Sequence, residues 1–165
     1  MKKLFVAATT ALMLAALAGN ANASNYKFPS DDPVAAVVIP DDWESGETES
    51  GVEATSPDEA VYLSIDVADA KSIDAVVDDA ITWLGEQGVT VDPATSKKSE
   101  DKVNGKDIFF VSWSGKDKDG PASVGLATMV LNAKTVLVFT YWGTKGEEEK
   151  SLPAINSILN SVTEP

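Results

Sequence analysis

Aromatic side chains are the first residues in this sequence whose types and positions point to a binding function. The candidate lining residues of a groove at one end of a sheet are Trp43, Trp113, Tyr141 and Trp142. Asp41 and Asp42 directly precede the first of these and would lie beside the groove if the first strand pairs nearby. The alternative is packing in and around the core, because aromatic side chains supply much of the buried area of a small domain.

The acidic segment from Asp117 to Gly120 is a second candidate. Two carboxylates in alternation before a glycine resemble part of a calcium loop, which makes Asp117 and Asp119 candidate metal ligands. The fuller pattern has a carboxylate two residues earlier, where Gly115 stands, and a later glutamate that is also missing. Short acidic segments with glycine are common in turns, so a polar hairpin turn is the favoured interpretation.

Three residue types are missing, and their absence excludes much catalytic chemistry. The 165 residues include no His and no Cys, and all 13 basic residues are Lys. Catalysis by His or Cys, imidazole or thiolate metal sites, disulfides and guanidinium recognition of phosphate are therefore excluded. Paired Asp or Glu could still perform acid–base hydrolysis if two carboxylates converged in a cleft. We expect no enzyme, in particular no kinase, and no cofactor.

The first residues have the three parts of a secretory signal peptide. Lys2 and Lys3 precede an apolar run at 4–18, and an Ala-x-Ala motif ends at Ala23. The run is shorter than the ~20 apolar residues of a membrane span, although an uncleaved anchor is the alternative. We predict cleavage after Ala23, a periplasmic or extracellular location, and no stable membrane insertion of the mature chain.

The sequence is strongly acidic. Its formal net charge is −13, and loss of Lys2 and Lys3 with the signal peptide would make it −15. Such a charge repels nucleic acid and anionic lipid, so no nucleic-acid partner is expected. Most of the carboxylates are interpreted as a solvated surface, and a cation or a basic protein is the sharper alternative.

Hydrophobic periodicity predicts two helices and seven or eight strands. Helices are expected at 72–87 and 151–162, where apolar residues recur at helical spacing. The expected strands are 34–39, two weak strands within 43–56, 60–67, 106–114, 123–132 and 135–142. In the strand at 60–67, Tyr62, Ser64 and Asp66 share one face and the apolar residues share the other.

These elements predict an α+β domain. The expected architecture is an α/β/α sandwich, in which a single antiparallel sheet has helices on both faces. The domain organisation is a cleaved signal peptide at 1–23, a flexible arm at 24–33 and one domain at 34–165.

Several short segments, in this order, resemble the PsbP/DcrB-like superfamily, which includes the Ran-binding Mog protein of eukaryotes. They are the segment from Ile39 to Glu44, the turn at 56–58, the helix from Ser72, the turn from Val103 to Lys106, and the closing segment at 158–162. The resemblance spans about 34–162 and implies an antiparallel sheet between helices and mostly non-enzymatic accessory or binding proteins. It implies no catalytic residues. The metal sites of some PsbP proteins involve His, which is absent here, and the Ran-binding role belongs to another compartment.

The favoured function is a secreted, non-enzymatic accessory or binding module of the bacterial cell envelope. Its partner is an unknown envelope protein or a small ligand. A divalent-cation (calcium) binding protein that uses acidic loops is the alternative, and a carboxylate-dependent hydrolase is the third possibility.

Overall fold

The computed structural model describes residues 23–69 and 72–165. The signal peptide predicted for 1–23 lies outside these residues except for Ala23, so its cleavage stays a prediction. Within the two described ranges, no helix has both the length and the apolar character that crossing a membrane requires.

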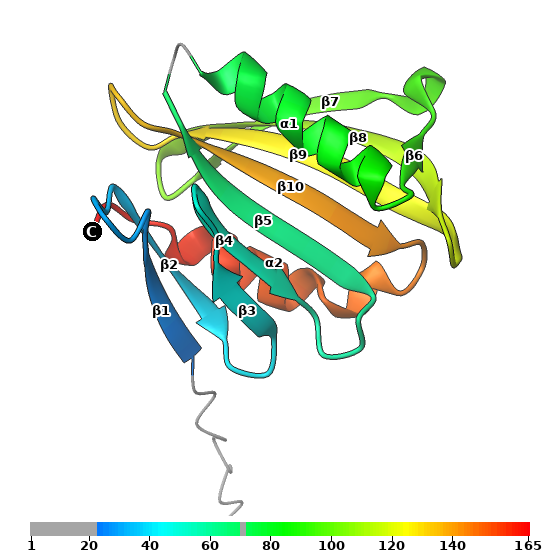
Figure 1. Cartoon of the computed structure of the whole chain (residues 1–165), viewed down its shortest axis with the longest axis horizontal. Coiled ribbons are helices and arrows are strands. Elements are labelled where there is room, and N and C mark those ends of the chain that lie inside the picture. The colour runs from blue at the N-terminus through cyan, green and yellow to red at the C-terminus, as the bar shows by residue number, and fades with distance from the viewer. Residues whose placement is uncertain (1–22, 70–71) are drawn as a thin grey trace, which may run out of the picture.

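Eight strands form one antiparallel sheet (Figure 1). In spatial order they are β3 (Glu44–Glu47), β4 (Gly51–Thr55), β5 (Val61–Ala68), β10 (Val136–Thr144), β9 (Gly120–Val130), β8 (Lys106–Asp117) and β6 (Thr90–Val91), and β7 (Lys97–Val103) also pairs with β8. The three longest strands, β8, β9 and β10, carry apolar residues on both faces, although Phe109 of β8 is 43% exposed. The predicted α+β class is confirmed.

The prediction of a flexible arm at 24–33 and of a single sheet is wrong. β1 (Ala23–Phe28) pairs antiparallel with β2 (Ala35–Pro40), and the two strands form a separate sheet. Tyr26 and Phe28 face inward on β1, and Phe28 is fully buried in the core. The C-terminal segment closes this sheet, because Ala36 and Thr163 exchange two backbone hydrogen bonds of 2.8 and 3.0 Å. Burial of the aromatic side chains thus orders a segment of polar composition.

Both predicted helices are present. α1 (Ile73–Glu86) lies against β5 and β10. α2 (Leu152–Ser161) has a proline in its first turn and packs mainly beside β2, so the layer it occupies contains the small sheet as well as a helix. The two short 3₁₀ turns are η1 (Pro93–Thr95) and η2 (Glu148–Lys150), and the second leads into α2.

The alternating residues of β5 divide the main sheet into two faces. On the core face, Leu63 and Ile65 join the large apolar cluster that also contains Phe139 and the buried residues of α2. On the opposite face, Tyr62 and Ser64 point toward α1. We call this face the cleft face, because a cleft lies between it and α1. The cleft face has only a small apolar cluster, formed by the buried residues Leu84, Val89 and Val124 with the partly buried Trp83, Trp113 and Trp142.

Candidate functional site

Trp43, Asp41 and Asp42 do not form the predicted groove. Trp43 is only 5% exposed and belongs to the main core. Asp41 and Asp42 are exposed in the turn that follows β2, where Asp41 accepts a 2.8 Å hydrogen bond from Ser24 Oγ. For Trp43 the packing alternative therefore describes the structure, since its indole is enclosed by apolar side chains.

The other three aromatic residues are divided between the two faces of the sheet. Trp113 lies opposite Val124, and Val124 lies opposite Trp142, so both tryptophans are on the cleft face. Tyr141 lies opposite Gly125 and packs against the main core. Trp113 and Tyr141 both have odd numbers, yet they lie on opposite faces, because antiparallel register and not numbering decides which residues of different strands share a face.

Tyr141 is held close to the segment that leads into α2. Burial, with the nearby Glu148 carboxylate, raises the pKa of the Tyr141 hydroxyl far above its usual value. Glu148 accepts a 2.7 Å hydrogen bond from Ser123 Oγ through one oxygen. Gly143 leaves room for the Tyr141 side chain, because a Cβ at position 143 would lie 2.6 Å from the Tyr141 hydroxyl oxygen. Tyr141 therefore lies apart from the two tryptophans, and it lines a separate pocket of about 290 Å³ beside α2.

The acidic segment forms the predicted hairpin turn between β8 and β9. Asp117 Oδ1 accepts hydrogen bonds from the amides of Asp119 and Gly120, at 2.8 and 3.0 Å, and Oδ2 accepts one from Trp142 Nε1 at 2.8 Å. Partial burial raises the pKa of Asp117, but these hydrogen bonds outweigh it and hold the pKa below its usual value. Asp119 pairs with Lys118.

The metal-binding alternative at this turn finds no support. Both oxygens of Asp117 are used by groups of the protein itself. Across residues 23–69 and 72–165, no three or more acidic side chains converge in a way that could hold a metal ion.

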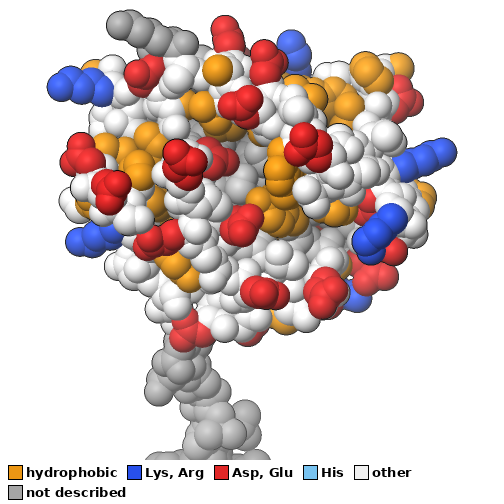
Figure 2. All heavy atoms as spheres, in the orientation of Figure 1, with side chains coloured by type: hydrophobic (Ala, Val, Ile, Leu, Met, Phe, Trp, Pro, Cys, Tyr) orange, Lys and Arg blue, Asp and Glu red, His pale blue; other side chains and the backbone are white. Residues whose placement is uncertain are grey.

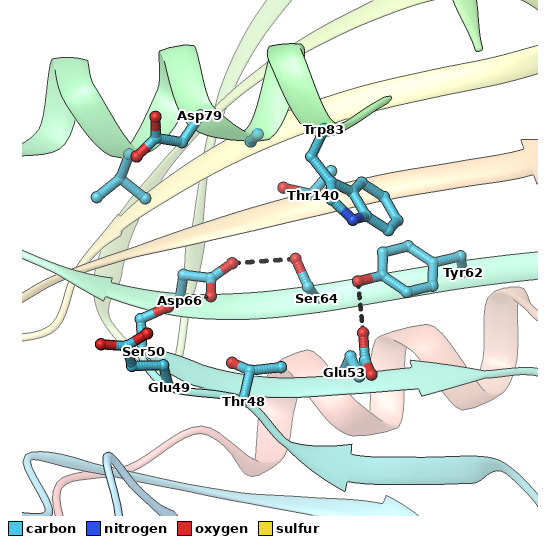
Figure 3. A pocket seen from close by; sticks show the side chains of 12 residues that line it. Thr48, Glu49, Ser50, Glu53, Tyr62, Ser64, Asp66, Asp79, Trp83 and Thr140 are labelled. Atoms are coloured by element: carbon cyan, nitrogen blue, oxygen red, sulfur yellow. Dashed lines mark hydrogen bonds between the residues drawn. The ribbon is translucent and has the colours of Figure 1, made fainter. Parts of the chain in front are cut away.

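Sequence reasoning missed a cleft between α1 and the cleft face of the sheet (Figure 3). The cleft has a volume of about 380 Å³. We call it the acidic cleft, and its lining residues are Thr48, Glu49, Ser50, Glu53, Tyr62, Ser64, Asp66, Val76, Asp79, Ala80, Trp83 and Thr140. They come from β4 and the turn before it, from β5, from β10 and from α1.

Tyr62 is the central aromatic residue of the acidic cleft. Its ring stacks on Trp83 with centroids 4.7 Å apart, and the ring of Trp142 lies 6.5 Å away. Its hydroxyl donates a 3.0 Å hydrogen bond to Glu53 Oε2 (Figure 3). Burial, followed by the contact with Glu53, raises the pKa of the Tyr62 hydroxyl far above its usual value. Tyr62 thus stays a neutral hydrogen-bond donor and holds the Glu53 carboxylate in place.

Hydroxyl groups also orient the carboxylate of Asp66. Its two oxygens accept hydrogen bonds from Ser50 Oγ at 2.8 Å and from Ser64 Oγ at 3.1 Å. Thr140 lies directly opposite Ser64 in the sheet and is 1% exposed, yet its Oγ1 atom has no hydrogen-bond partner. Buried hydroxyls are nearly always paired, so Thr140 is an unusual feature of the cleft.

Tyr62 also borders a second depression, of about 760 Å³, beside Trp142 and the β8–β9 turn. Its acidic lining residues are Glu44, Asp58, Glu59, Asp117, Asp119 and Glu147, and one lysine, Lys118, is among them. Figure 2 shows acidic side chains around hydrophobic ones on this side of the molecule. The sequence does show that Tyr62, Ser64 and Asp66 share a polar face of one strand, and this pattern is its signal for the acidic cleft.

Comparisons with known proteins match the fold and not the sequence. No protein-family profile and no curated protein sequence matches the chain. The solution structure of PsbP from Synechocystis sp. PCC 6803 has a TM-score of 0.57 at 9% identity, with 90% of this chain and 95% of that chain covered. A protein from Bacteroides thetaiotaomicron has a TM-score of 0.58 at 12% identity, and the match covers 86% of this chain and 48% of that one.

A third similar structure is LpqN of Mycobacterium tuberculosis, which is described as involved in cell envelope biogenesis. Its TM-score is 0.53 at 16% identity, with 86% of this chain and 91% of that chain covered. The chain therefore shares the fold of these structures, a PsbP protein among them, as the resemblance in its sequence implies.

Proposed function

We propose that this protein is an exported, non-enzymatic accessory module of the bacterial cell envelope, and that it binds a partner or small ligand in the acidic cleft. The observation that carries the proposal is the lining of this cleft. Stacked aromatic rings lie beside four carboxylates, and none of these carboxylates forms an ion pair within the described residues. A concave site with aromatic walls and a few oriented polar groups is typical of ligand binding.

Two further observations support this function. The chain lacks His and Cys, so the common nucleophile–base pairs of enzymes have no counterpart in it. LpqN, which shares the fold, is described as involved in cell envelope biogenesis. The signal peptide expected at residues 1–23 would deliver this chain to the cell envelope.

The test is capture of the protein from its own host. The chain would carry a tag at Pro165, and mild cross-linking of the cell envelope would be followed by mass spectrometry. The intact mass of the captured protein would report whether cleavage follows Ala23. A mass that retains Lys2 and Lys3 would contradict the predicted cleavage.

A matched pair of variants on α1 tests whether a captured partner or ligand binds in the acidic cleft. Asp79→Asn changes a lining residue, whereas Asp78→Asn makes the same charge change on a neighbouring exposed residue outside the lining. We expect a bound partner or ligand to be lost with Asp79→Asn and retained with Asp78→Asn. Equal recovery from both variants would contradict binding in the acidic cleft.

A further inference from the structure

The acidic cleft combines uncompensated negative charge with an aromatic and apolar wall. Its four carboxylates, Glu49, Glu53, Asp66 and Asp79, give a formal charge of −4 at neutral pH, and no lysine of the described chain lines the cleft. The wall beside them comprises Trp83 and Tyr62 with Val76 and Ala80 of α1. Aromatic faces attract cations as well as alkyl groups. The cleft is therefore suited to a ligand that is both cationic and partly aliphatic.

The buried hydroxyl of Thr140 is an independent sign of a ligand that forms hydrogen bonds, because it can accept or donate one more. Thr140 is 1% exposed, lines the cleft, and has an Oγ1 atom without a partner. Figure 3 shows Thr140 between Trp83 and Ser64, on the sheet side of the cleft. The carboxylate oxygens that line the same cleft are acceptors only. An ammonium group with N–H donors can satisfy these acceptors, whereas a quaternary ammonium group cannot.

The placement of the carboxylates favours an extended cation over a metal ion. Glu53 is on β4 and lies opposite Ser64 of β5. Asp66 lies farther along β5, and Asp79 lies across the cleft on α1. No group of three or more acidic residues in the described ranges converges to hold a metal. Because Glu53 lies opposite Ser64, it is displaced from Asp66 by two residues of β5, about 7 Å along the strand. Several positive charges separated by methylene groups match this spread of negative charge.

We propose that the acidic cleft binds a linear aliphatic polyamine. Its ammonium groups would contact Glu53, Asp66 and Asp79, and its methylene groups would lie against Trp83 and Tyr62. A cleft of about 380 Å³ accommodates a small molecule of this kind. A lysine-rich peptide presents the same alkylammonium groups, but its backbone would have to lie outside so small a cleft. This inference deepens the proposed function and rests on it.

Calorimetry of the purified protein tests the ligand class. Spermidine is the probe, and its binding is expected to be saturable with one molecule per chain and to weaken as the salt concentration rises. Choline, Mg²⁺ and trilysine are the comparisons. We expect each of them to bind at least tenfold more weakly than spermidine. Absence of saturable spermidine binding, or equal binding of Mg²⁺ or choline, overturns the proposal, and tighter binding of trilysine assigns the cleft to a peptide instead.

Variants then locate the binding. Asp79→Asn is expected to weaken spermidine binding by about threefold to tenfold, as for a partly exposed charge-assisted contact, and Asp78→Asn by less than about twofold. Thr140→Val removes only the buried hydroxyl, so it should weaken binding while the protein remains folded by circular dichroism. Equal effects of Asp79→Asn and Asp78→Asn would place any spermidine binding outside the acidic cleft and overturn the proposal.

The outcomes separate this inference from the proposed function. If capture of an envelope partner requires Asp79 but spermidine does not bind, the polyamine proposal is wrong and the proposed binding function is retained. If neither the captured partner nor spermidine depends on Asp79, both are wrong.

Discussion

The two faces of the main sheet are built from adjacent residues of the same strands, yet they differ in what they bury. The core face buries Leu63, Ile65 and Phe139 in one continuous apolar cluster. The cleft face carries Ser64 and Thr140 at neighbouring positions, and one of their two hydroxyls is buried without a partner. Apolar burial stabilises a fold, whereas an unpaired buried hydroxyl destabilises it. The core face therefore supplies stability, and the cleft face retains polar atoms that suit binding.

Ile65→Ala should have the largest effect, because it leaves a cavity in the core face. Ile65 is 1% exposed, and we expect the free energy of unfolding to fall by about 2–5 kcal/mol. Ser64→Ala, one residue away on the cleft face, should cost less than about 1 kcal/mol, the net value of one hydrogen bond. Urea denaturation measures both. Similar losses for the two variants would remove the difference between the faces.

Gly51→Ala should come next, because it breaks the strand contact that places Glu53 in the cleft. A Cβ at Gly51 would lie 1.8 Å from the carbonyl oxygen of Ile65, so the backbones of β4 and β5 would have to separate. We expect a loss of about 1–3 kcal/mol in urea denaturation. Gly46→Ala on β3 is the control, since nothing lies within 4 Å of its added Cβ. A stable Gly51→Ala variant would contradict this close approach.

Thr140→Val should change stability in the opposite direction. Removing an unpaired buried hydroxyl is expected to raise the free energy of unfolding by up to about 1 kcal/mol. Ser56→Ala is the contrast, because Ser56 is 2% exposed and its hydroxyl bonds to Asp58 and to the Val61 amide. That variant should lose about 1 kcal/mol. Thermal and urea midpoints report both, and a destabilised Thr140→Val would show that the hydroxyl has a partner in the free protein.

The smallest effect is expected from the pH dependence at Asp117. Its folded pKa lies below the usual 3.8, so its charge stabilises the fold above that value, and the contribution is lost as the pH falls through the folded pKa. Below pH 4, Asp117→Asn should therefore lose less stability than the unchanged protein, by under about 1 kcal/mol. Urea midpoints from pH 2 to 6 measure this. Asp107→Asn, at the other end of β8, is the control, and identical profiles for both variants would contradict a role of the Trp142 contact.

The elements predicted well are those with a local apolar pattern. The helix expected at 72–87 is α1, Ile73–Glu86, and the strand expected at 135–142 is β10, Val136–Thr144. β7 was missed because its residues are polar and exposed along almost its whole length. It is a strand only because its backbone pairs with β8. Edge strands of this kind have no apolar face, so periodicity carries no signal for them.

Composition by itself determined which chemistry is excluded, since a chain without His, Cys or Arg lacks imidazole, thiol and guanidinium groups wherever it folds. The pattern of β5 also showed that Tyr62, Ser64 and Asp66 share a face, because side chains alternate along any strand. Only the tertiary structure brought Glu53, Asp79 and Thr140 to that face. These residues come from β4, α1 and β10, and their meeting depends on strand register and helix placement, which arise from contacts between distant parts of the chain.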